Sequence, residues 1–472
     1  MGPHRCRQNT KEEKQEAFKT MKIDCKKYNM LPPPYKTKTI EPIKLIDRNE
    51  RIQAIRKACY NVFNLKSEDV YIDLLTDSGS SAMSTRQWSA IMSSDESYAG
   101  SKSFFKLQKA VQEILGFNYV IPCHQGRAAE HLLFRTLLKK GDTVPINMAF
   151  DTTAAHIKNI EAEYVNCVID CAYNFESNHP FKGNINIDKL EQTIKCSVRV
   201  PFIMITITNN SGGGQPVSMQ NMKQVKEVAD RYNLPVFFDA ARCAENAYFI
   251  QQNETKNKTV RQIMREQFSY ADGCTFSLKK DALVNMGGLI AVNSGKFYYK
   301  ILPNLILYEG FTTYGGLSGR DIEAIVVGMH EMIDDDYMAD RVKQIEYLGN
   351  QLKSAGITIM KPIGGHAVFI DAASFLSHIP REQFPADALA AELYIESGVR
   401  GVGLGTLAFG KNKRMELFRL AIPRRVYTNR HLDYVADAVQ RVFKRRDEVK
   451  GLEIVSSPAT LRHFLARLKI KE

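Results

Sequence analysis

Short apolar runs of strand length alternate with segments of helical periodicity through the middle of the chain. Residues 201–208 (PFIMITIT) and 235–239 (PVFFD) are apolar runs, and residues 219–233 between them place apolar side chains on one face of a helix. Residues 273–277 and 287–292 have the same strand-like character. Because a strand–helix–strand order favours parallel pairing with helices over both faces of the sheet, the pattern predicts an α/β fold.

The two ends of the chain depart from this pattern. The N-terminal residues are highly charged, and Leu31–Tyr35 (LPPPY) cannot continue a helix because consecutive prolines lack donors and fix φ. Residues 329–348 become long-helical and polar, which indicates a connection into a second, smaller domain. We therefore predict an N-terminal arm at 1–34, the first part of a small domain at 35–75, a large domain at 76–334 and the rest of the small domain at 335–472.

Composition favours a globular, intracellular protein. The 472 residues are 44% hydrophobic and 25% charged, far from the composition of disordered chains. No apolar run approaches the roughly 20 residues that a membrane helix needs, and the N-terminus is polar, so we expect neither a membrane span nor secretion. Nine cysteines without CxxC pairs fit free thiols in a reducing compartment, and the expected location is the cytoplasm.

The net charge of +12, from 64 Lys and Arg against 52 Asp and Glu, raises the question of a nucleic-acid partner. The basic residues are scattered in pairs such as Lys139–Lys140 and Arg424–Arg425, with a cluster at Lys444–Arg446. They do not form one stripe with interleaved aromatic residues. This distribution favours a solvated surface, and we expect no nucleic-acid partner.

Polar side chains follow apolar strands at several points, which matters because ligands of α/β proteins bind at the carboxyl edge of the sheet. Residues 122–130 (PCHQGRAAE) are the first such segment. Gly126 permits close backbone approach, the helix start offers free N–H groups, and Arg127 supplies a fork for an anion. An ordinary glycine-containing helix start is the alternative interpretation.

Two later segments carry a carboxylate and an amine. Asp239 lies in the segment 238–242 (FDAAR), at the end of the apolar run 235–239. A carboxylate at the end of a buried strand needs a cation, so a structural ion pair with Arg242 is one interpretation. Residues 277–281 (SLKKD) hold two adjacent lysines. These are either surface charges or, when partly buried, amines of lowered pKa that can form a Schiff base.

An anion cradle, a strand-end carboxylate and a strand-end lysine together suggest pyridoxal 5′-phosphate (PLP). The chain also resembles the tryptophanase and tyrosine phenol-lyase family of β-eliminating enzymes from about residue 35 to its end. The stretches that carry the resemblance include YIDLLTDSGS (71–80), DESYAGS (95–101), HQGRAAE (124–130), GGGQPVSMQN (212–221), SYADGCTFSLKKD (269–281), YEGFTTYGGLSGRD (308–321) and RLAIPRRVYT (419–428).

The resemblance implies a PLP enzyme of the aminotransferase-like fold type I, with a large, mostly parallel sheet domain and a smaller α/β domain. Lys280, with Lys279 beside it, would form the Schiff base, and Asp239 would keep the pyridine nitrogen protonated so that the ring accepts electrons. The other residues implied are Gln125, Gly126, Arg127 and Ser277 for the phosphate, Phe150 stacked on the ring, and Asn210 and Arg242 at the ring oxygen.

The resemblance also implies substrate-binding and catalytic residues. Arg419 would bind the carboxylate of an amino-acid substrate through its planar fork. Tyr98 would protonate the leaving aromatic ring, in the site of a neighbouring subunit of a homotetramer. Gly79, Glu96 and Asn285 match a potassium site made of two backbone carbonyls and one carboxylate.

Three positions bear on which aromatic amino acid is split into pyruvate, ammonium and the free ring. Asp151 stands where the phenol-lyases carry Thr, Leu404 where they carry an Arg for the phenol hydroxyl, and His463 where they carry an aromatic residue. An apolar Leu404 cannot bind a hydroxyl, whereas an Asp and a His suit an indole N–H and the proton traffic around it. These residues favour tryptophan, and we predict a tryptophanase.

Other interpretations stay open at this point. Asp151 also suits a helix start, and His463 suits a surface position on a terminal segment. Asn285 resembles the phenol-lyase version of its motif, and the connection at 139–142 lacks the longer insertion of many tryptophanases. A tyrosine phenol-lyase, a broader cysteine or serine β-lyase and an aminotransferase of the same fold are the alternatives.

Overall fold

The computed structural model describes residues 32–410 and 415–472. The chain divides into two units, residues 1–38 and 39–472. Of the first unit only residues 32–38 are described, and they contain no helix or strand, so the predicted arm at 1–34 lies almost entirely outside the described residues. Within the described ranges, no helix is both long and apolar enough to cross a membrane. All elements below belong to the second unit.

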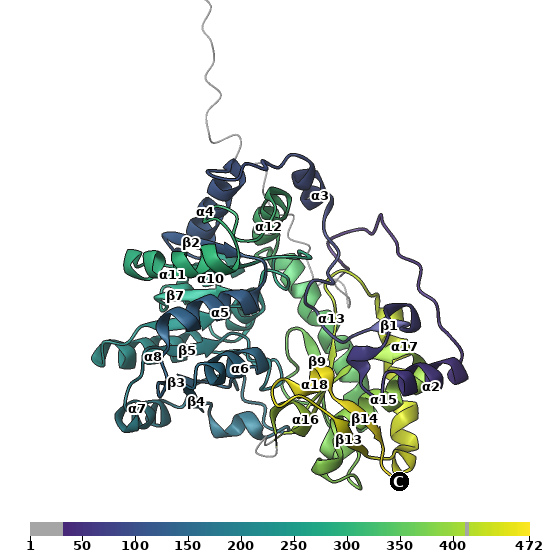
Figure 1. Ribbon diagram of the computed structural model, residues 1–472. Helices are drawn as coiled ribbons and strands as arrows, with labels where there is room; N and C mark the ends of the chain where they lie inside the picture. Colours follow the sequence, from purple (N-terminus) through teal and green to yellow (C-terminus); the bar gives the residue numbers. More distant parts are fainter. Residues whose placement is uncertain (1–31, 411–414) are drawn as a thin grey trace, which may run out of the picture. The chain divides into compact units, whose positions relative to one another are not determined.

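A seven-stranded sheet forms the centre of this unit (Figure 1), with the strand order β2-β8-β7-β6-β5-β3-β4. Neighbours from β7 through β4 pair in parallel, whereas β8 pairs antiparallel with both β7 and β2. The strands are β2 Tyr119–Cys123, β3 Thr143–Ile146, β4 Glu163–Asn166, β5 Ile203–Thr206, β6 Val236–Asp239, β7 Gly273–Phe276 and β8 Gly288–Val292. The predicted α/β class with a mostly parallel sheet is confirmed.

The continuous apolar runs reflect burial on both faces of the sheet. Met204 and Phe237 pack into the core under α5, α6 and α11, whereas their neighbours Ile205 and Phe238 pack into the core under the helices of the opposite face. All four side chains are fully buried. Because side chains alternate along a strand, a strand with helices on both sides needs apolar residues at every position.

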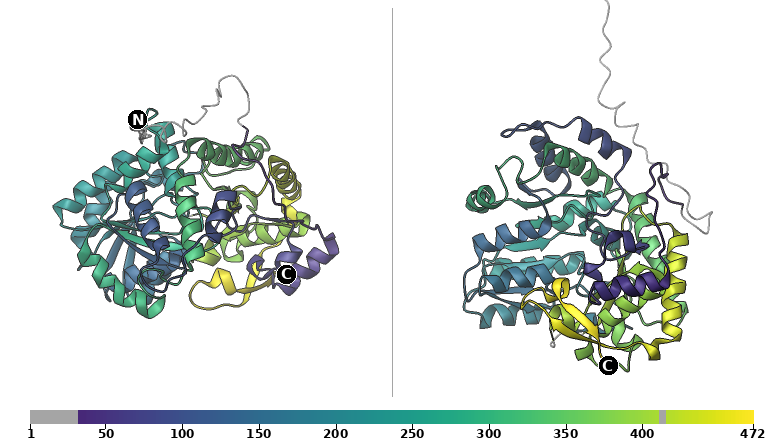
Figure 2. Two further views of the ribbon diagram at one scale, coloured as in Figure 1. Left: turned by 90° about the horizontal axis from the view of Figure 1, so that it is seen from above. Right: turned by 45° about the vertical axis from the view of Figure 1, so that its right-hand side comes forward.

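Helices cover both faces of the sheet, as the view from above in Figure 2 shows. One face carries α5 Gly126–Leu137, α6 Asp151–Asn159 and α11 Gly295–Tyr308. The other carries α4 Lys102–Ile114, α7 Ile187–Cys196, α8 Met219–Arg231, α9 Cys243–Asn253, α10 Val260–Phe268 and α12 Gly319–Glu331. Helix α3 Thr85–Met92 packs against α12.

A second core holds the C-terminal part of the chain together with residues from its beginning. Its sheets are the antiparallel β11-β12-β9, the parallel pair β1-β10 and the antiparallel hairpin β13-β14. The strands are β1 Ile72–Asp73, β9 Ala367–Asp371, β10 Val399–Arg400, β11 Val402–Leu404, β12 Leu417–Ala421, β13 Leu452–Ser456 and β14 Arg467–Ile470. The helices are α2 Arg48–Lys57, α13 Asp335–Ser354, α14 Ala372–Phe375, α15 Pro385–Ser397, α16 Thr406–Phe409, α17 Asn429–Lys444 and α18 Arg462–Leu465.

Pairing across the chain ends ties this second core together. β1 pairs with β10, and the Leu468 N–H of β14 donates to the Cys59 carbonyl at 2.9 Å, just after α2. In Figure 2 the yellow hairpin accordingly lies beside the purple α2. The four domain boundaries stay a prediction, although residues of 35–75 and of 335–472 do share one core.

The predicted long helix at 329–348 is two helices. α12 ends at Glu331, and α13 begins at Asp335 after a turn. The side chain of Asp334 accepts a hydrogen bond from the Tyr337 N–H at 2.8 Å, so it caps α13. A strong N-cap residue starts a new helix where periodicity alone suggests continuation. The first half of α13 packs in the large core and its second half in the second core, so α13 links the two.

A buried network of charged side chains joins the two cores. Arg424, 1% exposed, follows β12 and contacts three carboxylates: Asp77 Oδ2 at 2.9 Å, Glu245 Oε1 at 2.7 Å and Asp281 Oδ1 at 2.8 Å. Arg242 binds Asp77 through a bidentate fork with N–O distances of 3.0 and 2.6 Å. Burial opposes ionisation of Asp77, but the two guanidinium groups outweigh burial and hold its pKa well below the usual value.

Replacement of Arg424 by Met should lower the free energy of unfolding by about 3–5 kcal/mol, because it leaves buried carboxylates without their cation. Urea denaturation of the full chain measures this change. The control is Arg441→Met, which removes an exposed pair with Asp437 at 2.8 Å and should cost less than about 1 kcal/mol. Equal effects of the two substitutions would contradict a special role for the buried network.

Candidate active site

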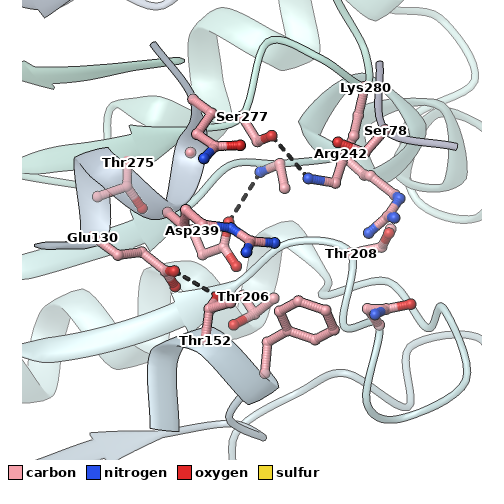
Figure 3. Close-up of a pocket in the computed structure, with 16 residues that line it drawn as sticks. Ser78, Glu130, Thr152, Thr206, Thr208, Asp239, Arg242, Thr275, Ser277 and Lys280 are labelled. Carbon is pink, nitrogen blue, oxygen red and sulfur yellow. Dashed lines mark hydrogen bonds between the residues drawn. The ribbon is translucent and has the colours of Figure 1, made fainter. Parts of the chain in front are cut away.

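The carboxyl ends of β2, β5, β6 and β7 meet at one edge of the sheet, where they border a pocket (Figure 3). Thr206, Asp239 and Thr275 lie side by side in the strand register at this edge. The pocket and its mouth hold about 660 Å³ free of protein atoms, which includes space open to solvent. It is lined by Ser78, Gln125, Gly126, Arg127, Glu130, Phe150, Thr152, Thr206, Thr208, Asn210, Asp239, Ala241, Arg242, Thr275, Ser277 and Lys280. The nine residues that the sequence assigns to a cofactor are all among them.

Lys280 provides an amine in the pocket wall. Its Nζ donates a hydrogen bond to Ser277 Oγ at 2.8 Å. Burial and the neighbouring charge of Arg242 lower the pKa of Lys280 to about 8, while Asp77, Asp239 and Glu130 oppose this shift. A substantial fraction of the amine is therefore neutral at mildly alkaline pH, and the interpretation of Lys280 as a surface charge is wrong.

Asp239 ends β6 and faces the same pocket (Figure 3). Its Oδ1 accepts a hydrogen bond from the Ala241 N–H at 3.1 Å. Burial raises the pKa of this carboxyl, although the nearby Lys280 charge lowers it in part. The suggested structural pair with Arg242 is wrong, because both ends of the Arg242 fork bind Asp77.

The start of α5 lies beside Ser277 and offers donors to an anion. Helix α5 begins at Gly126, and Arg127 follows it in the pocket wall. A Cβ on residue 126 would lie 2.5 Å from the Ser277 Cβ, so only glycine lets the helix start approach Ser277 this closely. Gln125 contacts His124 at 3.0 Å between Nε2 atoms, and His124 Nδ1 lies 2.6 Å from Glu309 Oε2.

Arg419 reaches the pocket region from β12. Its Nη1 donates to Asn210 Oδ1 at 3.2 Å and its Nη2 to the Leu75 carbonyl at 2.9 Å. Within the part of the chain that the structure describes, the buried Arg419 Nε and Asn210 Nδ2 have no hydrogen-bond partner. Buried donors without acceptors are costly, which indicates that a polar ligand completes them.

Asp151 and His463 form a buried pair beside the pocket residues Phe150 and Thr152. His463 Nε2 lies 3.0 Å from Asp151 Oδ2, and the two residues are 2% and 6% exposed. The interpretation of His463 as a surface histidine is therefore wrong. Asp151 lies in the first turn of α6, and its Oδ1 accepts a hydrogen bond from the Thr152 N–H at 2.6 Å. Asp151 therefore both stabilises the start of the helix and binds His463.

Other predicted residues lie outside the pocket in the single chain. Tyr98 is 69% exposed and stacks on Phe311 with ring centroids 5.5 Å apart. Asn285 Nδ2 donates to the Gly79 carbonyl at 2.9 Å, so these two are neighbours. Glu96 instead accepts from the Gly319 N–H at 2.9 Å and pairs with Arg320.

Potassium at Gly79, Glu96 and Asn285 thus stays a prediction. In the described ranges, no group of three or more His, Cys, Asp or Glu side chains could hold a metal ion.

Sequence reasoning missed two acidic residues at the site. Asp77 holds Arg242, and Glu130 lines the pocket from α5. One feature of the sequence could have pointed to Glu130: it lies four residues after Gly126 and therefore on the same face of the helix. Asp77 had none, since its partner is far away in sequence.

Comparison with known proteins defines the class. The family model "Beta-eliminating lyase" matches residues 73–438, and the chain belongs to this family. Solved structures with the same fold include SPT with PLP (TM-score 0.58, 14% identity, 81% of this chain and 89% of that chain covered) and serine palmitoyltransferase from Sphingomonas wittichii (TM-score 0.57, 13% identity, 85% and 97% covered). The expected fold type I architecture is thus confirmed.

Similar proteins in this family are named for different activities. Tyrosine phenol-lyase from Symbiobacterium thermophilum is 52% identical over 448 residues, covering 92% of this chain and 98% of the relative. Tryptophanase from Salinibacter ruber is 50% identical over 448 residues, covering 93% and 95%. A probable beta-eliminating lyase from Trichomonas vaginalis is 48% identical over 447 residues, covering 92% and 98%.

The amine of Lys280 should react with acetic anhydride in a pH profile with a midpoint near pH 8, because burial favours its neutral form. Ordinary lysines titrate near pH 10.4. Mass spectrometry of peptides after labelling at a series of pH values measures the midpoint. Asp239→Asn should move it lower, since the Asp239 charge raises the Lys280 pKa, and should leave the profile of the exposed Lys140 unchanged. A Lys280 midpoint near pH 10 would contradict this account.

Proposed function

We propose that this protein is a PLP-dependent lyase that cleaves L-tryptophan by β-elimination to indole, pyruvate and ammonium. Membership of the β-eliminating lyase family supports the reaction type. The buried Asp151–His463 pair is the observation that supports tryptophan as the substrate.

The pocket fits PLP. Gln125, Gly126, Arg127 and Ser277 would hold the phosphate at the start of α5, where free N–H groups favour an anion. Lys280 and Asp239 supply the amine and the carboxylate that the cofactor needs. When bound, PLP supplies an electron-accepting ring that stabilises negative charge on the α carbon of an amino acid.

The remaining chemistry falls to side chains of the chain itself. The Lys280 amine, with a pKa of about 8, can take the proton from the α carbon, because a general base works best when its pKa is near the working pH. Asp239 would hold the proton on the cofactor's ring nitrogen. Arg419 would bind the substrate carboxylate through its fork, which completes the buried Nε donor.

The substrate side chain is the point on which the two sister activities differ. A buried histidine held by a carboxylate can keep or transfer a proton next to an indole ring. Leu404, 2% exposed on β11, packs among apolar side chains and offers no partner for a phenol hydroxyl. Both features support tryptophan.

Tyrosine is the second candidate substrate. The relative from Symbiobacterium thermophilum named tyrosine phenol-lyase is 52% identical to this chain, slightly above the 50% of the tryptophanase from Salinibacter ruber. Overall identity reflects the whole chain, however, whereas the substrate choice depends on a few pocket residues. Assembly through a neighbouring copy, suggested by the exposed Tyr98, is a further part of this proposal.

Purified protein supplied with PLP should release indole from L-tryptophan with a higher kcat/KM than it releases phenol from L-tyrosine. Indole and phenol are measured separately by chromatography, and pyruvate is measured in both reactions. Faster release of phenol would show a tyrosine phenol-lyase. Conversion of the amino acid to its own aromatic keto acid without release of ammonium, when an added keto acid accepts the amino group, would show an aminotransferase.

His463→Phe should lower kcat for tryptophan by about 100-fold or more, the lower range for loss of a positioned proton carrier. Activity on an S-substituted cysteine should change little, because a thiolate leaves without protonation of a ring carbon. His378→Phe is the matched control, since His378 contacts the Val449 carbonyl at 2.8 Å and does not line the pocket. Equal loss on both substrates would assign His463 a structural role instead.

A further inference from the structure

Glu130 is an acidic residue of the pocket that the proposed chemistry leaves unused. It lies on α5, is 6% exposed and lines the pocket together with Asp239. In Figure 3 the carboxyl groups of Glu130 and Asp239 point into the same part of the pocket. Two carboxyl groups therefore share one buried wall.

The contacts of Glu130 fix its position but do not neutralise it. Its Oε2 accepts a hydrogen bond from Thr152 Oγ1 at 2.6 Å, and its Oε1 accepts one from Thr153 Oγ1. Both hydroxyl groups are neutral and come from the first turn of α6, directly after Phe150 and Asp151. Glu130 thereby links the pocket wall to the first turn of α6, which directly follows Phe150.

The charge of Glu130 depends on its surroundings. Burial raises its pKa to about 7, the charges of Asp239 and Asp151 add to this rise, and the two threonine hydroxyls oppose it. The charge of Lys280 interacts with Glu130, and Arg127 and Arg242 line the same pocket. Like charges in one buried wall disfavour ionisation of both carboxyl groups, so an added positive charge at Asp239 would favour it.

We propose that Glu130 is a positioning residue that acts through Asp239: in the cofactor-free pocket it holds a proton at mildly acidic pH, and it ionises more readily when a protonated ring nitrogen binds at Asp239. The Glu130 O–H bond breaks and the proton passes to water, so the bound state keeps a second negative charge beside the nitrogen. This strengthens the hold of Asp239 on the protonated ring. The inference rests on the proposed function in so far as PLP supplies that nitrogen.

The PLP dissociation constant, measured by absorbance titration of the full chain between pH 5.5 and 8.5, tests the proposal. Glu130→Gln keeps the size of the side chain but cannot ionise. At pH 8 it should weaken PLP binding about tenfold, the factor that corresponds to one pKa unit. Towards pH 5.5 the two proteins should converge, because the protonated Glu130 side chain and the glutamine amide of the variant are both uncharged.

A matched control separates this effect from the loss of any buried carboxyl. Glu323 is 5% exposed, accepts from Ser103 Oγ and Lys106 Nζ at 2.7 Å each, and does not line the pocket. Glu323→Gln should leave PLP affinity unchanged. If Glu130→Gln binds PLP as tightly as the wild type, or more weakly by the same factor at every pH, the proposal is wrong, since a purely structural role predicts no pH dependence.

Unfolding of the cofactor-free chain provides a second readout that does not depend on PLP. The raised pKa means that the folded state binds more protons than the unfolded state between about pH 4.5 and 7, so the wild type loses stability as pH rises through this window. Glu130→Gln should gain stability relative to the wild type over the same window. A difference in the free energy of unfolding between variant and wild type that does not change with pH would contradict the raised pKa of Glu130. Failure of the wild type to bind PLP would instead reject the proposed function, and the unfolding series would still decide the coupling.

Discussion

The buried contacts of Arg424 are the interaction on which the rest of the site depends. One guanidinium binds carboxylates from three segments, each far from the others in sequence: Asp77 after β1, Glu245 on α9 and Asp281 after β7. A buried charge is tolerated only when paired, so these segments can fold against each other in one arrangement. That arrangement places β12, and Arg419 on it, beside the strand ends of the large sheet.

The same network defines the charges around the pocket. Asp77 is shared between Arg424 and Arg242, which turns the Arg242 fork away from Asp239. Asp239 is thus free to serve a ligand. Burial then acts in opposite directions on the pocket groups: it lowers the pKa of Lys280 and raises the pKa of Asp239 and Glu130. An amine of lowered pKa and carboxyl groups of raised pKa are the kind of groups that acid–base chemistry uses near neutral pH.

Much of this could be predicted from the sequence. Continuous apolar runs located the strands β5 to β8, and the polar residues at their ends, Lys280 and Asp239 among them, do line one pocket. Strand ends are local features, and parallel pairing brings them together. The break between α12 and α13 was missed because Asp334 as an N-cap interrupts a periodicity that otherwise continues.

Partner choice across the fold could not be predicted. Arg242 follows Asp239 closely in the chain, yet its partner is Asp77, and His463 meets Asp151 from the opposite end of the sequence. Periodicity reports which face of an element is buried, whereas an ion pair depends on which remote segment packs against that face. In the sequence, Glu130 resembles an exposed glutamate of a helix, because the segments that bury it are remote in the chain.

The central claim is that this pocket holds PLP through Lys280. Reduction of the PLP-loaded protein with borohydride, followed by peptide mapping, identifies the lysine to which the cofactor is attached. We expect the label on the peptide that contains Lys280, and none on that peptide in Lys280→Ala. A protein that takes up no PLP, or a label on another lysine with Lys280 unmodified, would contradict it.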